Sequence, residues 1–104
     1  MAQHDVYRNP SPRSRATLPY LLDVQADLLS RLTTRLVVPL ARVGVGPKPI
    51  QTLNPTLYVE GEAVVLLTEQ MASVHTRDLG EPVAKLQAER ATIVAALDLI
   101  FTGF

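Results

Sequence analysis

The sequence predicts one domain that is mainly β and finishes with one α-helix. Short runs of β-branched and aliphatic residues, separated by turn residues, occupy most of the chain. The last part changes to apolar spacings of three and four, the period of an amphipathic helix. Several short strands followed by a terminal helix indicate an α+β or small-barrel arrangement, and not a repeated strand–helix–strand unit.

The expected strands are residues 5–8 (DVYR), 20–24 (YLLDV), 35–41 (RLVVPLA), 56–59 (TLYV), 63–68 (AVVLLT) and 71–75 (MASVH). The run at 35–41 is the clearest, because it is the richest in β-branched and aliphatic residues. Pro39 lies inside it and cannot donate a hydrogen bond to a neighbouring strand, which favours an edge or a bulge. The sequence Glu60-Gly61-Glu62 lies between two runs and predicts a hairpin turn.

Two segments between the strands are rich in turn residues. Residues 9–15 (NPSPRSR) contain two prolines, two serines and two arginines, which predicts an exposed loop. That loop is either simply solvated or a contact site for an acidic partner. Residues 42–55 contain three prolines and two glycines and predict a second, longer loop.

The terminal helix is expected over residues 81–101. Pro82 suits the first turn of a helix, where its missing N–H is not needed. Glu81 would lie near the positive end of the helix dipole. Gly103 could end the helix in a left-handed conformation.

Composition narrows the possible functions. A chain of 104 residues forms one domain, residues 1–104, with one modest core. Ten basic residues balance ten acidic residues, so no overall field attracts nucleic acid or an anionic membrane. The absence of cysteine excludes disulfides and thiolate metal sites and fits a cytoplasmic protein. The chain has no apolar run near the length of a membrane span, and residues 1–15 do not resemble a secretory signal.

The residues alone predict no catalytic site, metal site or cofactor. His4 lies in a stretch expected to be frayed, and the two histidines lack metal-ligand spacing. Ser73, His75 and Asp78 are close in sequence, but the chain lacks the Gly-x-Ser-x-Gly motif of a nucleophile turn. Residues 44–48 (GVGPK) lack the later glycine and the helix of a phosphate-binding loop.

Five blocks, in this order and spacing, resemble the CcdB family of toxins from toxin–antitoxin modules. They are DVYR, YLLDVQADLL, RLVVPLA, LTEQMASV and LDLIFTGF, and they extend from residue 5 to residue 104. The resemblance implies an SH3-like barrel of antiparallel strands with a C-terminal helix, a plan that CcdB and MazF toxins share. It also implies a homodimer that is not itself an enzyme, binds the A subunit of DNA gyrase and traps the cleaved-DNA complex. A cognate CcdA-like antitoxin would neutralise it.

The resemblance also suggests binding residues. The positions that match gyrase contacts are Leu28, Leu29, Asp98, Thr102, Gly103 and Phe104. Leu28 and Leu29 could equally be core residues, and Asp98 could be an ordinary solvated side chain. Phe101 matches a packing position and is expected in the core or in a dimer interface. Arg8, Arg13 and Arg15 are expected to supply charge partners for the antitoxin.

One departure leaves alternatives open. Thr102 stands where the family has a tryptophan that anchors the toxin in gyrase. The protein could therefore be a diverged module that holds an antitoxin and poisons gyrase weakly or not at all. A second alternative is a MazF-like messenger RNA endonuclease, which would need an arginine such as Arg35 or Arg42 as acid or base.

Overall fold

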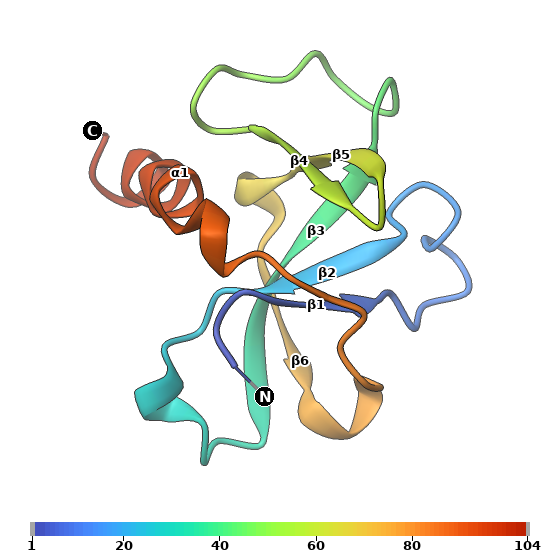
Figure 1. Ribbon diagram of the computed structural model, residues 1–104, viewed down its shortest axis with the longest axis vertical. Coiled ribbons are helices and arrows are strands. Elements are labelled where there is room, and N and C mark those ends of the chain that lie inside the picture. The colour runs from blue at the N-terminus through green and yellow to red at the C-terminus, as the bar shows by residue number, and fades with distance from the viewer. Residues whose placement is uncertain (1, 104) are drawn as a thin grey trace.

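The computed structural model describes residues 2–103, which form one bent antiparallel sheet and a C-terminal helix (Figure 1). The strands are β1 (Asp5–Arg8), β2 (Tyr20–Asp23), β3 (Thr34–Arg42), β4 (Thr56–Val59), β5 (Glu62–Leu66), β6 (Ala72–His75) and β7 (Ala84–Lys85). The helix is α1 (Arg90–Thr102). Four 3₁₀ helices connect them, namely η1 (Asp27–Leu29), η2 (Thr68–Gln70), η3 (Thr76–Asp78) and η4 (Gln87–Glu89).

The strands follow the order β4-β5-β3-β2-β1-β7 around a nearly closed barrel, with β6 as an additional partner of β3. Strand β3 is the longest of those in residues 2–103, and β2 pairs with one side of it. On the other side, its first half pairs with β6 and its last residues pair with β5. The predicted class, a mainly β SH3-like barrel with a C-terminal helix, is confirmed.

The main core lies between one face of the sheet and α1. Its fully buried residues are Val6, Leu22, Val38, Leu40, Val59, Val64, Leu66, Ile93 and Ala96. Side chains alternate between the two faces of a strand, so every second residue of β3 and β5 enters this core. Ile93 and Ala96 fix α1 against the sheet, and the C-terminal end of α1 is directed away from the strands (Figure 1).

The other face of the sheet carries buried polar groups among a smaller apolar cluster. Tyr7, Leu21, Val37 and Leu79 form that cluster. Burial raises the pKa of Tyr7 to about 12. Asp23 and Arg35 form an ion pair here, with both side chains fully buried. Burial raises the pKa of Asp23 above its ordinary value, although the hydrogen bond from Arg35 opposes that shift.

Pro39 lies in the middle of the sheet, so the expectation of an edge or a bulge was wrong. It pairs with Leu21 of β2, and its carbonyl accepts a hydrogen bond of 3.0 Å from the Leu67 amide. The Pro39 nitrogen, which carries no hydrogen, faces the gap along β3 between the part that pairs with β5 and the part that pairs with β6. A proline is tolerated there because neither of those strands needs its hydrogen at that point.

The predicted start of the helix at residue 81 was wrong, since α1 begins at Arg90. The Val83 amide donates to the Val6 carbonyl at 2.7 Å, and the Leu86 amide donates to the His4 carbonyl at 2.9 Å. These bonds hold residues 83–86 against β1 as an edge strand. Main-chain pairing with an available sheet edge therefore outweighs the helix signals of Glu81 and Pro82.

Two other local predictions are confirmed and one is wrong. The β4–β5 connection is a tight turn in which Glu60 and Gly61 have φ values of 52° and 81°. Gly103 has φ 79°, and its amide donates to the Leu99 carbonyl, so it ends α1 in the left-handed conformation. The expectation of a frayed segment at His4 was wrong. The His4 side chain is buried, and its amide donates to the Asp23 carbonyl.

Candidate partner-binding surfaces

The last turn of α1 is exposed, and residues 98–103 are called the helix tip below. Asp98, Thr102 and Gly103 are all exposed there. The Thr102 hydroxyl donates a 2.7 Å hydrogen bond to the Asp98 carbonyl one turn earlier. The threonine side chain therefore folds back onto its own helix, which leaves the tip with little apolar area at this position. Phe104 lies outside the described residues.

Phe101 supplies the large apolar surface of the helix tip. Its side chain is 68% exposed, so the alternative that it packs in the core of its own chain was wrong. Ile100, beside it, is 37% exposed. The reason is geometric, because Ile93 and Ala96 face the sheet and the tip extends past it. Large exposed apolar side chains on a small domain commonly mark a contact surface.

A second apolar surface lies in and after η1. Leu28 is 92% exposed, Leu29 is 47% exposed and Leu32 is 51% exposed. The alternative that Leu28 and Leu29 are core residues was therefore wrong. Hydrogen bonds with neighbouring segments hold η1 in place, since the Gln3 main-chain amide donates to the Asp27 side chain and the Gln25 side chain donates to the Leu29 carbonyl. Leu32, which follows the pair after the two polar residues Ser30 and Arg31, was not predicted as part of this surface.

The helix tip and η1 do not meet within one chain. Figure 1 shows the turn that follows β2 and the C-terminal end of α1 as separate projections. The six residues expected to contact gyrase thus fall on two surfaces, apart from Phe104, which is not described. A single partner would have to span both, or a second copy would have to bring them together.

Of the three arginines expected to bind the antitoxin, two lie together in the structure. Arg8 and Arg15 line one depression of about 240 Å³, together with Asn9, Pro19, Tyr20 and Arg42. We call this depression the arginine hollow. Arg13 is exposed on the same loop but does not line the hollow. Sequence reasoning missed Arg42 as part of this group, because it ends β3, a strand that is distant in sequence from residues 8–15.

Hydrogen bonds fix the loop that carries Arg15. The Asn9 side chain donates to the Ser14 hydroxyl and to the Leu18 carbonyl, both at 2.9 Å. Arg42 holds the same loop from β3, since its Nε donates to the Ala16 carbonyl at 2.9 Å. The predicted loop is confirmed, and its internal bonds make it a defined surface.

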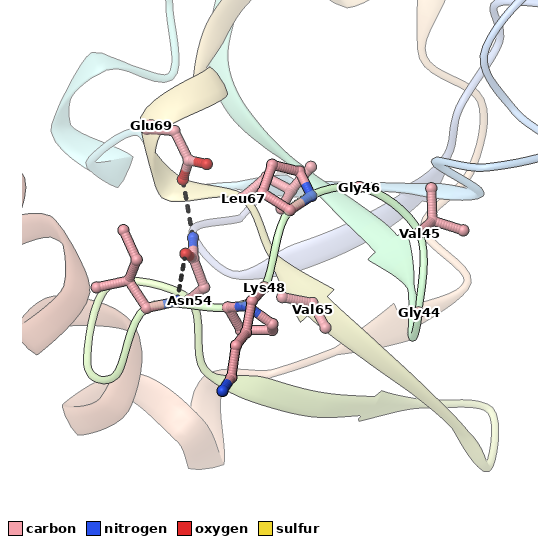
Figure 2. Close-up of a pocket in the computed structure, with 11 residues that line it drawn as sticks. Gly44, Val45, Gly46, Lys48, Asn54, Val65, Leu67 and Glu69 are labelled. Atoms are coloured by element: carbon pink, nitrogen blue, oxygen red, sulfur yellow. Dashed lines mark hydrogen bonds between the residues drawn. The ribbon is translucent and has the colours of Figure 1, made fainter.

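Another pocket lies under the loop that contains Gly44 to Ile50, and Figure 2 shows its lining. It encloses about 140 Å³ against Val65, Leu67 and Glu69. Asn54 is buried at its base, where it accepts from the Ile50 amide and donates to Glu69 and to the Leu66 carbonyl. The polar groups of Asn54 bond to other parts of the same chain, so the residues that line this pocket mainly hold the long loop in place.

The structure also limits the catalytic and metal alternatives. Arg35 is fully buried in its pair with Asp23, so it does not face a partner. Arg42 is exposed and stays accessible. Within residues 2–103, the histidine and carboxylate side chains form no group of three that could hold a metal ion. In the same range, the helices lack the combination of length and apolar character that a membrane crossing requires.

The family model described as CcdB protein matches residues 3–103 of this chain. The chain belongs to the CcdB family. The resemblance noted in the sequence is confirmed over nearly the whole chain, and membership supports a toxin of a toxin–antitoxin module of the CcdB type. The exposed helix tip and the arginine hollow are therefore surfaces of a CcdB family member, and their partners are proposed below.

Proposed function

We propose that this protein binds the A subunit of DNA gyrase and traps the cleaved-DNA complex. It acts in the cytoplasm as a homodimer, it is not itself an enzyme, and a cognate CcdA-like antitoxin neutralises it. The observation that carries the proposal is the helix tip, an ordered and exposed end of α1 that presents Asp98, Phe101, Thr102 and Gly103.

The physical support is that the tip is both apolar and held in place. Ile93 and Ala96 are fully buried and anchor α1, and Gly103 closes its last turn. An apolar surface on a rigid element loses little conformational freedom on binding, which favours a specific partner over loose association. A two-fold pairing would place two such tips side by side. Leu28 and Leu29 of η1 would provide the second gyrase contact.

Antitoxin binding rests on a different surface. Arg8, Arg13 and Arg15 are exposed around one loop that internal hydrogen bonds hold in place. A disordered segment with acidic and apolar residues could lie along this loop and reach Leu28 and Leu29. Folding on binding costs such a segment several kcal/mol, roughly 2–5 by general experience, which a long interface can offset.

A second function has a specific observation in its favour. The Thr102 hydroxyl bonds to its own helix at Asp98 and does not extend from the tip. A protein whose tip lacks the family's tryptophan could still hold the antitoxin on its other surface while poisoning gyrase weakly or not at all. The protein would then act as an antitoxin sink.

The decisive measurement is gyrase-mediated DNA cleavage with purified protein, comparing the full chain with a variant that lacks residues 102–104. The proposal predicts accumulated cleaved DNA with the full chain and none with the truncation, while both bind the antitoxin. Antitoxin binding without cleavage by the full chain would support the sink. Cleavage of messenger RNA by the purified protein would contradict both.

A further inference from the structure

We propose that the arginine hollow is a carboxylate-binding site, whose Arg8 and Arg42 pair with the protein's own Glu60 and Glu62 until an acidic segment of the antitoxin displaces these two carboxylates. The identity of the partner rests on the proposed function. The recognition of carboxylates by the hollow does not, and it is tested separately below.

The hollow gathers three guanidinium groups from three parts of the chain. Arg8 ends β1, Arg15 comes from the following loop and Arg42 ends β3. The planar guanidinium group matches a carboxylate and can bind it through two parallel hydrogen bonds. Arg42 is held in position, because its Nε donates to the Ala16 carbonyl. Asn9, Pro19 and Tyr20 complete the lining.

Two carboxylates, Glu60 in the β4–β5 turn and Glu62 at the start of β5, already reach two of these arginines. Glu60 lies 3.5 Å from Arg8 and also accepts a 3.3 Å hydrogen bond from the Tyr20 hydroxyl. Glu62 pairs with Arg42. The hollow has three guanidinium groups, and two carboxylates pair with them, which leaves one positive charge without a counter-charge. Among the described residues, the ion pairs include Arg8 and Arg42 but not Arg15.

These internal pairs are weak enough to exchange. The side chains of Arg8 and Glu60 are 67% and 46% exposed, and those of Arg42 and Glu62 are 46% and 36% exposed. Water screens such pairs, so replacing one carboxylate by another has a small net free-energy change. A partner with several carboxylates can therefore bind Arg15 first and then replace Glu60 and Glu62 as the ion-pair partners of the other two arginines.

The turn that carries the glutamates is suited to this role. Glu60 has φ 52° and Gly61 has φ 81°, so the tight turn brings Glu60 and Glu62, the first residue of β5, to the same end of the hairpin. Because the hairpin does not need the carboxylates for its own pairing, their charge can be removed without unfolding it. Removing either carboxylate should therefore make the hollow bind an acidic peptide more tightly, and this gain is the most informative test.

The test is an NMR titration of ¹⁵N-labelled protein with two capped peptides, Leu-Glu-Leu-Glu-Leu-Glu and the same peptide with Gln for Glu. We expect the Glu peptide to shift the Nε–Hε signals of Arg8, Arg15 and Arg42, and the Gln peptide to leave them in place. Glu60→Gln and Glu62→Gln should each tighten the Glu peptide about two- to five-fold, the range of an exposed ion pair. Arg15→Gln should weaken it by a similar factor.

Matched controls remove the effect of net charge. Glu81→Gln and Arg77→Gln make the same charge changes at exposed positions that do not line the hollow. The proposal is overturned if Glu81→Gln tightens the peptide as much as Glu62→Gln does. It is also overturned if the Gln peptide, or inorganic phosphate at the same concentration, shifts the three arginine signals equally.

A second arm separates this site from the proposed antitoxin binding. Calorimetry with the cognate antitoxin should show tighter binding for Glu62→Gln than for Glu81→Gln. If the peptide results hold and the antitoxin does not bind, the hollow recognises carboxylates and the proposed partner is wrong. If the antitoxin binds both variants equally, the displacement of Glu62 by the antitoxin is wrong.

Discussion

Arg35 Nη2, on β3, lies 2.7 Å from Asp23 Oδ2, on β2, and both side chains are completely buried. The Arg35 Nε also donates to the same oxygen at 2.8 Å. Asp23 accepts a further bond from the Gln25 amide, which links the pair to the segment leading into η1. The pair therefore links the face of the sheet that carries the smaller apolar cluster to the loop that exposes Leu28.

Removing one member of this pair should strongly destabilise the fold. Asp23→Asn keeps the side-chain shape but leaves the buried guanidinium of Arg35 without a counter-charge, which generally costs about 3–5 kcal/mol. The double variant Asp23→Asn with Arg35→Met should recover a large part of that loss, because it buries no unpaired charge. Urea unfolding of the wild type, both single variants and the double variant measures this. Equal stability of Asp23→Asn and wild type would contradict it.

Acidification should weaken the N-terminal part of the barrel through His4. Burial, followed by the charge of Arg90, lowers the pKa of His4 below its ordinary value of 6.5, although Asp27 partly opposes this. A lowered folded-state pKa means that the unfolded chain takes up the proton more readily. The contribution of His4 is therefore present above pH 6.5 and is lost as the pH falls through the folded-state pKa.

The test of that pH dependence is urea unfolding at several pH values for wild type and His4→Asn. Asparagine tolerates the positive φ of 71° at this position but does not titrate. Stability should fall less for the variant than for wild type between pH 7 and pH 5. Parallel curves for the two proteins would show that another group causes the acid effect.

The protein should form a symmetric dimer in which Phe101 is partly covered. A side chain of this size that is 68% exposed on a small domain favours burial against a second copy. Sedimentation equilibrium at micromolar concentration should give twice the chain mass of 11.4 kDa. Phe101→Asp should shift the equilibrium toward the monomer, whereas Val45→Asp, at a residue 40% exposed in the long loop, should not. A pure monomer for wild type would contradict the prediction.

Reversing charge on the loop of residues 9–15 should slow antitoxin association. The variant Arg13→Glu with Arg15→Glu replaces attraction with repulsion near the loop, which reduces the association rate most strongly at low salt. The matched control reverses Arg31 and Arg77, which are exposed on other segments. Association rates from surface plasmon resonance at two salt concentrations would measure the effect. An equal slowing by both double variants would assign the effect to net charge alone.

The strands could be predicted from the sequence because their signals are local. Runs such as DVYR and RLVVPLA contain β-forming residues bounded by turn residues, and the structure places β1 and β3 over them. The start of the helix could not be predicted in the same way. Ala84 and Lys85 become β7 because β1 offers an unpaired edge, and that edge exists only after the barrel has formed. Pro39 was misplaced for a similar reason, since its neighbours across β3 come from later parts of the chain.

The candidate surfaces were predictable only where the residues are neighbours in sequence. The helix tip and Leu28 with Leu29 could be identified as groups before the structure was known, but their exposure could not. The arginine hollow needed the fold, because β3 brings Arg42 to the loop that carries Arg15. Charge alone could not separate Arg42 from Arg35, which lies on the same strand and is fully buried.

The last prediction concerns Thr102 and decides between a gyrase poison and an antitoxin sink. A buried aromatic anchor at an interface contributes roughly 2–4 kcal/mol when it is truncated. Thr102 bonds back to Asp98, so it does not replace that apolar area. If a dimer presents the tip twice, a loss of ~2 kcal/mol per copy weakens gyrase binding about a thousandfold. Thr102→Trp should therefore strengthen DNA cleavage by gyrase, while Thr102→Val, which removes only the hydroxyl bond, should change it little. The measurement is the protein concentration that gives half-maximal cleavage for the three proteins. Wild type as potent as Thr102→Trp would show that Phe101 or another part of the tip already supplies the anchor.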